Sequence, residues 1–463
     1  MNEQKTKELT HIAGTFLIQA EGSFLNGSTN EKNEGYDITT PKTLQEFNKK
    51  IPYVSAQAWR HWLRETYRDE NPDDPSTPIE TTGCKEGEGD DKEKFTTNKV
   101  GFCIDPIKYA EQDIFGYMDA KSGQGAGGVK ATIRKSPFQS SILLSIRKSG
   151  WEGIDKGFVH PESIALSYYE NVLDELAECK SLTLEQKTNI SKLKKIVKEN
   201  LSRTDLVKRL QEALQQLEKD SKSKDVEKAI KRIILSVPSP LPYQTRFYNT
   251  QLQGIFGIDF HRIGLFRNAG DREELEEKLV EKYLADGSIQ SKNSADKSVS
   301  EFEVKDKLVR VDRVRKILKS LALLRGGAKQ TQFGTDVSPK VIILAGLTCG
   351  NLIFNDLFED TKEIVTSPRE KSEDVVPSDV IGGVRIKIDA LKEIIKDYSD
   401  RIITPVYIGY RKGYLSADTE KKLEEWKKNP KDPKVSAAIE LCSPIEAINS
   451  FVANLSPKHN GNT

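Results

Sequence analysis

Residues 307–347 read KLVRVDRVRKILKSLALLRGGAKQTQFGTDVSPKVIILAGL, and this stretch decides the predicted fold. Over residues 307–324 the apolar positions recur every three or four residues, which predicts a helix whose buried face carries Val311, Val314, Ile317, Leu318 and Leu321. Gly326 and Gly327 follow where glycine commonly caps a helix. Residues 341–347 are an unbroken apolar run with the length of a buried strand. A helix that leads directly into such a strand indicates a sheet covered by helices.

A similar strand and helix occur near the start of the chain. Residues 11–20 (HIAGTFLIQA) have the length and composition of a strand, and the polar stretch that follows is read as a mobile loop ending at Pro41. After Pro52, the sequence YVSAQAWRHWLRETYRDE predicts a helix with Ser55 as its N-cap. The spacing predicts that its buried side carries Trp59, Trp62, Leu63 and Tyr67.

Further strand-like segments lie between these two units. Ordered sequence resumes at residues 100–107, and in residues 113–146 a Gly-rich turn separates two strand-like runs, which predicts a hairpin followed by a long central strand. Strand-like sequence resumes at residues 245–266. The order strand, helix, strands, helix, strand predicts an α+β protein with the βαββαβ pattern of a ferredoxin-like or RRM-like fold.

Three polar insertions interrupt this pattern. The core segments are predicted at residues 1–68, 100–149, 244–267 and 307–463. Residues 69–99 form an acidic, flexible insertion that is almost free of apolar residues between 69 and 94. Residues 150–243 include Lys/Glu-rich helices at 162–235, and residues 268–306 combine a short amphipathic helix with a Ser/Lys/Asp-rich linker.

Charge and cysteine content limit the function classes. Among 463 residues, 71 Lys and Arg oppose 70 Asp and Glu, so the net charge is +1 and any nucleic-acid groove must be local. The five cysteines contain no CxxC pair, which favours a reducing cytoplasm over a disulfide framework or a zinc ribbon. The longest apolar run, residues 341–347, is too short for a membrane helix, and the start MNEQKTKELT is too polar for a signal peptide. We therefore expect a cytoplasmic protein without membrane contact.

Three segments are candidate nucleic-acid contacts. In RGGAKQTQFGTDVSPK, Gly326 and Gly327 allow close backbone approach to a phosphate and Lys329 can neutralise it, although a helix cap and a turn would look the same. Arg60 and Arg64 lie four residues apart beside aromatic residues, as a backbone-tracking helix requires, and a solvated helix face is the alternative. Tyr117 and Met118 can wedge between bases or can be buried strand residues.

Catalytic patterns are absent from the sequence. A hydrolase needs paired acid and base groups or a metal cluster, and the histidines show neither HxH nor HExxH spacing: His11, His61, His160, His261 and His459. Asp37, in the polar loop, is the one carboxylate worth testing, and its default role is that of a surface acid. The sequence predicts no enzyme activity, no metal and no cofactor.

The ordered set of segments resembles the backbone subunit of type I CRISPR surveillance complexes (Cascade), in particular the DevR-type, subtype I-B-like branch of the RAMP superfamily. The matching segments are HIAGTFLIQAEGSFLNG, PYVSAQAWRHWLRET, DIFGYM with ATIRKSPFQSSILLSI, FYNTQLQGIFGIDFHRIGLF and RGGAKQTQFGTDVSPK. The resemblance implies an RRM-like palm with a thumb between Arg147 and Tyr248. The Lys/Glu-rich helices lie inside that interval and depart from the simplest family pattern.

The resemblance also implies partners and contact residues. Copies of the chain would assemble head to tail along a CRISPR RNA, pair it with a target DNA strand and bind other Cascade subunits. The family's RNA-contacting helix corresponds to Ser55, Gln57, Arg60, His61 and Arg64, and its Gly-rich contact loop to Gly326, Gly327, Lys329 and Gln330. A local basic groove would then comprise Lys42, Arg60, Arg64, Lys130, Arg134 and Lys329, balanced by the acidic stretch 69–94.

Two alternative functions also fit the sequence. Type III relatives with this palm cleave target RNA with a loop aspartate, so a guide-directed ribonuclease using Asp37 is one alternative. The other is a monomeric RRM-type RNA-binding protein that occupies a single short site. Regularly spaced protection of a long RNA would distinguish the scaffold from this second alternative.

Overall fold

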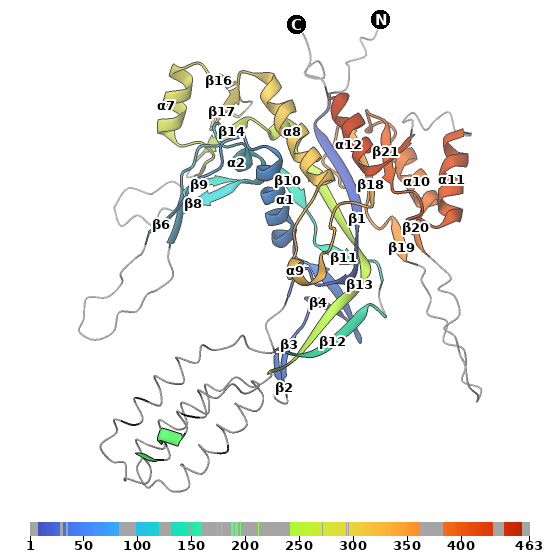
Figure 1. The fold of residues 1–463 in the computed structure, drawn as a ribbon. Coiled ribbons are helices and arrows are strands. Elements are labelled where there is room, and N and C mark those ends of the chain that lie inside the picture. Colours follow the sequence, from blue (N-terminus) through green and yellow to red (C-terminus); the bar gives the residue numbers. More distant parts are fainter. Residues whose placement is uncertain are drawn as a thin grey trace, which may run out of the picture. The chain divides into compact units, whose positions relative to one another are not determined.

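A computed structural model describes most of the chain outside four long segments (Figure 1). The described residues are 8–27, 31–33, 36–82, 99–119, 131–147, 150–159, 241–270, 272–292, 294, 296–360, 383–428 and 439–455, with a few single helical positions between 174 and 212. The chain divides into two compact units. The main unit comprises Met1–Ser28, Pro41–Gly153 and Arg246–Thr463, and the second unit comprises Thr29–Thr40 and Ile154–Thr245.

The main unit is built on a mixed sheet with β1 (His11–Ser23) at its centre. β1 pairs antiparallel with β13 (Leu241–Ile258) on one side and with β18 (Val341–Leu347) on the other. Beyond β13 lie β10 (Phe138–Ser140) and β11 (Leu143–Ser145), followed by β5 (Lys49–Val54) and β4 (Thr43–Glu46). Beyond β18 lie β21 (Val406–Tyr410) and β22 (Ile439–Cys442).

Helices cover both faces of this sheet. One apolar core joins it to α1 (Ala56–Glu70), α8 (Lys307–Ala322) and α12 (Pro444–Ala453). The opposite core contains α10 (Ile388–Asp397), α11 (Ala417–Lys428) and the pair β19 (Phe358–Asp360) and β20 (Val384–Ile386). Side chains alternate between the two cores because successive strand residues point to opposite faces: Ile342 joins the first core and Ile343 the second. The centre of the sheet is therefore buried on both faces.

A smaller sheet in the main unit has the order β16-β17-β14-β15-β9-β8. Its strands are β16 (Ile289–Lys292), β17 (Val299–Val304), β14 (Leu265–Ala269), β15 (Arg272–Glu273), β9 (Ala131–Arg134) and β8 (Tyr117–Asp119). Helix α7 (Glu277–Ala285) packs on it through Val280 and Tyr283. The short helix α2 (Ala110–Phe115) leads directly into β8.

The second unit contains β2 (Glu31–Asn33), β3 (Tyr36–Thr39) and most of β12 (Glu152–Val159). β3 pairs antiparallel with β2 and parallel with the first residues of β13, where Asp37 is opposite Tyr243. β12 also pairs with β13. The predicted helical insertion at 162–235 lies largely outside the described residues, and the positions described there, such as Lys187 and Ile190, are helical.

Several sequence predictions are confirmed. The helix predicted from Ser55 is α1, and the Ser55 side chain caps it by accepting a hydrogen bond from the Ala58 amide. The helix predicted at 307–324 is α8, and the strand at 341–347 is β18. β8 and β9 pair antiparallel as the Gly-rich hairpin requires. In the described parts of the chain, every helix is too short or too polar to span a bilayer.

Other predictions were wrong in detail. The long central strand expected in 113–146 is three short strands, because the chain leaves β9 at Lys135 and Pro137, which lacks an N–H donor, separates it from β10. The long strand is instead β13, with 18 residues. The polar linker within 268–306 includes the paired strands β16 and β17. The loop before Pro41 contains β2 and β3.

The acidic insertion 69–99 is also partly ordered. β6 (Ile79–Thr82) pairs with β7 (Lys99–Phe102), and residues 83–98 lie outside the described part of the chain. Before β6, Asp74 accepts hydrogen bonds from the Tyr67 hydroxyl at 2.6 Å and from Lys316 Nζ at 2.6 Å. These contacts attach the first residues of the insertion to α1 and α8.

Candidate nucleic-acid interface

Helix α1 buries its aromatic side and exposes its polar side. Trp59 is fully buried, and its indole N–H donates to the Ser141 carbonyl oxygen at 2.7 Å. Trp62 is also buried, which confirms that the two tryptophans belong to the core. Because residues three and four apart share a helix face, the polar side presents Gln57, Arg60, His61 and Arg64. Gln57 and His61 are exposed, and the two arginines are half-buried.

Arg60 is held in place by uncharged acceptors. One of its terminal nitrogens donates to the Phe115 carbonyl oxygen at 3.0 Å and to Ser136 Oγ at 2.9 Å. Burial lowers the pKa of Arg60, and the nearby charge of Arg64 lowers it further. Arginine nevertheless stays charged at neutral pH. These hydrogen bonds therefore fix the orientation of Arg60, and neither of the two partners neutralises its positive charge.

Arg64 lies against the same aromatic residue. Its guanidinium carbon is 5.1 Å from the Phe115 ring centroid, and its Nε is 3.9 Å from Glu111 Oε2. Burial lowers the pKa of Arg64, while Glu111 raises it. The Arg64 side chain is 39% exposed, so this cation is accessible from solvent.

Three distant segments meet at the residues that follow β1. The Lys42 amide donates to the Asn26 carbonyl oxygen at 3.0 Å, and the Ser55 amide donates to Asn26 Oδ1 at 3.3 Å. The Ala328 amide donates to the Leu25 carbonyl oxygen at 2.9 Å. We call this convergence of Lys42, Ser55 and the loop Gly326–Gln330 on Leu25 and Asn26 the β1-end junction. It brings together three of the segments that the sequence predicted to contact RNA.

The Gly-rich loop requires its glycines for packing. Gly326 and Gly327 have φ values of 139° and 112°, and a Cβ on Gly326 would lie 2.4 Å from Trp62 Cγ. The two glycines do not cap α8, whose C-cap is Leu323. Gly326 instead lets the chain pass over Trp62, and Gly327 lets it pass close to Leu25, which corrects the predicted helix cap. The Gln330 side chain closes the loop by donating to the Gly326 carbonyl oxygen.

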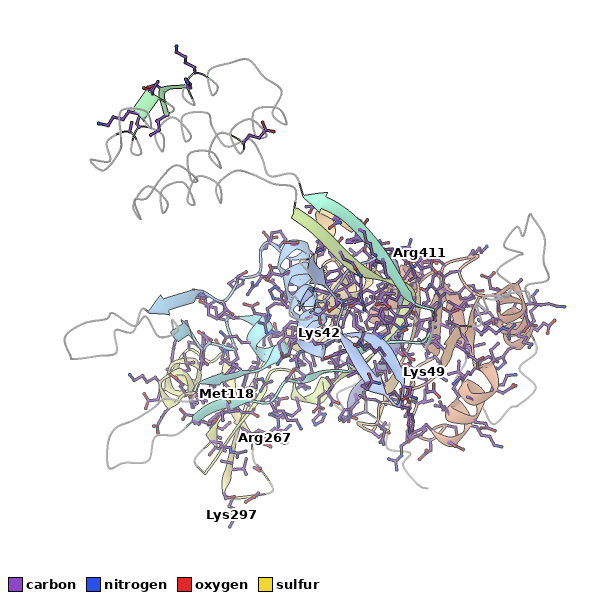
Figure 2. All side chains as sticks on the ribbon, turned by 90° about the horizontal axis from the view of Figure 1, so that it is seen from below. Lys42, Lys49, Met118, Arg267, Lys297 and Arg411 are labelled. Carbon is purple, nitrogen blue, oxygen red and sulfur yellow. The ribbon has the colours of Figure 1, made fainter. Side chains whose placement is uncertain are left out.

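Lys329 is placed beside an aromatic pair at this junction. Its Nζ is 5.1 Å from the Phe24 ring centroid, and the Phe24 ring stacks on Phe333 with centroids 6.5 Å apart. Lys42 lies immediately before β4, and exposed Lys49 begins β5 (Figure 2). The junction thus combines cations, aromatic rings and a backbone loop, which is the combination used to bind single-stranded nucleic acid.

Two predicted contact residues are structural instead. The side chain of Arg134 has no exposed surface and forms ion pairs with Asp113 and with Glu274. It therefore cannot neutralise a phosphate, and the prediction for Arg134 was wrong. Tyr117 is buried, its hydroxyl donates to the Glu274 carbonyl oxygen, and burial raises its pKa.

The remaining predicted residues have different outcomes. Met118 is 67% exposed on β8, an edge strand of the smaller sheet, where Figure 2 labels it. Lys130 lies outside the described residues. Asp37 belongs to strand β3 of the second unit and not to a loop, whereas Arg60 and Arg64 belong to the main unit.

Sequence reasoning missed the residues that organise the junction. Asn26 and Phe24 lie in the segment SFLNG directly after a strand, where Asn and Gly commonly begin a turn. Phe115 supports Arg60 and Arg64 of α1 from a different helix. The turn signal was present for Asn26, but nothing in the local sequence indicates which distant arginine Phe115 contacts.

Comparisons with known proteins give distant structural matches only. No protein-family model matches the chain, and no curated protein is significantly similar to it. A chain of a "CRISPR RNA-guided surveillance complex, pre-nicking" is similar with a TM-score of 0.42 and 11% identity, covering 96% of this chain and 99% of the other. A chain of a "CRISPR RNA-guided surveillance complex" is similar with a TM-score of 0.36 and 10% identity, covering 96% and 99%. Similarity at this level assigns neither a fold nor a function to this chain.

Proposed function

We propose that this chain is a non-catalytic RNA-binding subunit that forms the backbone of a CRISPR RNA-guided surveillance complex. The observation that carries the proposal is the β1-end junction. Lys42, Ser55 and the Gly326–Gln330 loop are far apart in sequence, and hydrogen bonds to Leu25 and Asn26 bring them together. The resemblance of the sequence to the DevR-type Cascade backbone implied RNA contacts for the helix that starts after Ser55 and for the Gly326–Gln330 loop, and Lys42 was predicted as part of the local basic groove.

The strand order supports a palm of the expected type. Counted along the chain, the strands β1, β11, β13 and β18 are the first to the fourth, and they lie in the order β18-β1-β13-β11. Helix α1 lies in the connection after β1, and α8 lies in the connection before β18. The βαββαβ pattern of a ferredoxin-like fold places two helices in the same connections. In this proposal the main unit is the palm, and the interval between Arg147 and Tyr248 provides the thumb.

Burial of the sheet argues against the simple RRM alternative. An RRM stacks bases on aromatic residues of an open sheet face. Here β18 is buried along its whole length, and β1 contributes to the apolar cores on both faces. The RNA would instead run along the polar side of α1 and the β1-end junction. The proposal therefore places no RNA on either face of this sheet.

The proposed contacts recognise the RNA backbone and not its sequence. Arg60, Arg64 and Lys329 would neutralise phosphates, and the hydroxyl of Ser55 together with Gln57 can reach ribose 2′-hydroxyls. Met118 would wedge between bases. Base pairing between the guide and a target DNA strand would supply all sequence information, while further copies of the chain and other subunits continue the assembly.

Assembly of the purified protein on RNA tests the proposed scaffold function. Purified protein is mixed with an RNA of arbitrary sequence and with one twice as long, and the masses are measured by sedimentation. We expect the number of bound copies to double with RNA length and to be the same for two unrelated sequences. A single bound copy on both RNAs would favour the monomeric alternative and sink the scaffold proposal.

The same samples test the ribonuclease alternative. Intact RNA after incubation with Mg²⁺ or Mn²⁺ is the expected result, because the proposed subunit only holds its guide. RNA cleavage by the wild-type protein that disappears in Asp37→Ala would contradict the non-catalytic part of the proposal. Asp155→Ala, a second acid of the same unit, is the matched control for that substitution.

A further inference from the structure

The strand register brings two distant histidines to one carboxylate. β1 and β13 pair with Ile12 opposite Ile258, so His11 lies next to Asp259, and the 3₁₀ turn η1 (Phe260–Arg262) brings His261 to the same place. Asp259 Oδ1 is 3.0 Å from His11 Nε2 and 2.9 Å from His261 Nδ1. The two imidazole rings are 5.1 Å apart in an edge-to-face arrangement. None of these residues belongs to the proposed RNA interface.

The hydrogen bonds around Thr10 determine which nitrogen of His11 carries a proton. The Thr10 hydroxyl donates to the Leu347 carbonyl oxygen at 3.2 Å, so its oxygen accepts from His11 Nδ1 at 2.8 Å. In neutral His11 the Nε2 atom therefore carries a lone pair, and this lone pair faces the Asp259 carboxylate. Two acceptors facing each other at 3.0 Å repel unless a proton or a cation lies between them.

The carboxylate itself lacks good hydrogen bonds. Asp259 Oδ1 is buried and makes no hydrogen bond of acceptable geometry, although both imidazole nitrogens lie within 3.0 Å of it. His261 Nδ1 also lies 3.2 Å from the Thr10 carbonyl oxygen, which can only accept, so neutral His261 with its proton on Nδ1 can donate there and toward Asp259. A divalent cation would replace that proton and the one that His11 Nε2 would otherwise need to face the carboxylate.

We propose that His11, Asp259 and His261 bind a zinc ion through His11 Nε2, His261 Nδ1 and the Asp259 carboxylate. Two imidazoles and one carboxylate are a ligand set that Zn²⁺ favours, with a fourth position open to water. The three donor atoms lie within 4.8 Å of one another, so small side-chain movements would bring them to bonding distance. The Thr10 hydroxyl that fixes the His11 tautomer is the kind of supporting contact that metal-binding histidines have.

Bound zinc would join the beginning of β1 to the end of β13. These two strands lie side by side in the middle of the main sheet. A metal that binds only the folded chain stabilises it, so the site predicts stability that depends on zinc concentration. The side chains are 20%, 25% and 41% exposed for His11, Asp259 and His261, which leaves an entry path.

The test uses the full chain without RNA, so its failure is independent of the proposed function. Metal-free protein is titrated with Co²⁺ and followed by visible ligand-field absorption, and then zinc is added. We expect one equivalent of cobalt, displacement by zinc, and a higher melting temperature with zinc. His261→Gln and Asp259→Asn should each weaken cobalt binding by more than about tenfold. His61→Gln, which alters an exposed histidine on α1, is the control and should bind as the wild type does.

Two results would overturn the proposal. Equal cobalt binding by His261→Gln and by the wild type would show that the metal binds elsewhere. No binding by the wild type would leave the three residues as a carboxylate between imidazoles. Should Asp259→Asn fail to fold, His261→Gln still decides the question, because its ring is the most exposed of the three.

Discussion

Arg60 and Arg134 illustrate how partners decide the role of a charged residue. Arg60 follows Trp59, and Arg134 ends the strand-like run ATIR. Both were predicted to contact RNA. Arg60 donates to a carbonyl oxygen and a hydroxyl, so its charge is oriented but not paired by them. Arg134 is surrounded by the carboxylates of Asp113 and Glu274 and has no exposed surface. Only Arg60 can therefore serve a negatively charged ligand.

Removing the positive charge of Arg60 should lower the affinity for RNA and its salt dependence. Arg60→Gln keeps hydrogen-bond donors for Phe115 and Ser136 but removes the cation. We expect RNA affinity to fall about tenfold for every sequence and the salt dependence to flatten by about 0.7 in log–log slope, as for one lost phosphate contact. Arg60→Lys should restore the slope. Lys297→Ala, an exposed lysine before β17 (Figure 2), is the control, and an unchanged slope in Arg60→Gln would place the groove elsewhere.

Arg134 should matter for folding and not for binding. Arg134→Met leaves Asp113 with Arg313 as its remaining cation, so we expect a loss of about 3 kcal/mol in the free energy of unfolding. Arg267 offers a control, because its side chain is 42% exposed although its partner Glu301 is partly buried, so Arg267→Ala should cost only about 1 kcal/mol. Urea denaturation measures both values. Equal losses in the two variants would contradict the assignment of Arg134 to a buried network.

At the scale of the element, the loop between α8 and β18 depends on packing as much as on backbone conformation. Gly326, Gly327 and Gly334 all have positive φ. A Cβ on Gly326 would overlap Trp62, whereas a Cβ on Gly334 would meet nothing within 4 Å. Alanine at Gly334 therefore carries only the cost of the left-handed backbone, whereas alanine at Gly326 adds the overlap with Trp62 to a φ of 139°, which lies farther from the regions open to alanine.

Gly334→Ala and Gly326→Ala form a matched pair. Alanine at Gly334 should cost about 1 kcal/mol for its left-handed backbone alone. Alanine at Gly326 should cost about 1–3 kcal/mol more, because the Trp62 ring must move to relieve the overlap. Thermal unfolding compares them, with Trp fluorescence reporting on the ring. Similar melting temperatures for the two variants would show that the loop does not rest on Trp62.

At the scale of the whole molecule, the main unit is organised around a sheet buried on both faces. Phe256 of β13 is fully buried against Phe16 of β1, with centroids 6.3 Å apart, and stacks on Phe138 of β10 at 6.4 Å. This cluster joins three strands that are distant in sequence. Stability of the main unit should therefore depend on contacts of high sequence separation.

Truncating an aromatic side chain in this cluster should strongly destabilise the main unit. Phe256→Ala should lower the free energy of unfolding by about 3–5 kcal/mol through lost burial and a cavity. Phe47, between β4 and β5, is 93% exposed, and Phe47→Ala should change stability by less than about 0.5 kcal/mol. Denaturant unfolding of both variants checks the difference. A small effect of Phe256→Ala would mean that this part of the sheet is not part of the cooperative core.

Local sequence predicted much of the fold but only part of the candidate site. Trp59 and Trp62 were assigned to the buried side of α1 because side chains at helical spacing share one face. The position of the Gly-rich loop was predicted correctly. Its predicted function as a helix cap was wrong, because Gly326 makes room for the Trp62 ring, which belongs to a different helix. Tyr117 and Arg134 were misassigned because burial of a polar side chain depends on distant partners.

By itself the sequence determined where α1, α8, β1 and β18 form, since hydrophobic periodicity and the Ser55 cap act over a few residues. Only the tertiary structure decided that β1 lies between β13 and β18, and with it that His11 meets Asp259 and that Asn26 joins Ser55. The physical reason is the distance along the sequence over which each interaction acts. Periodicity and capping are local, whereas strand register, ion pairing and close packing depend on residues that the chain brings together only when it folds.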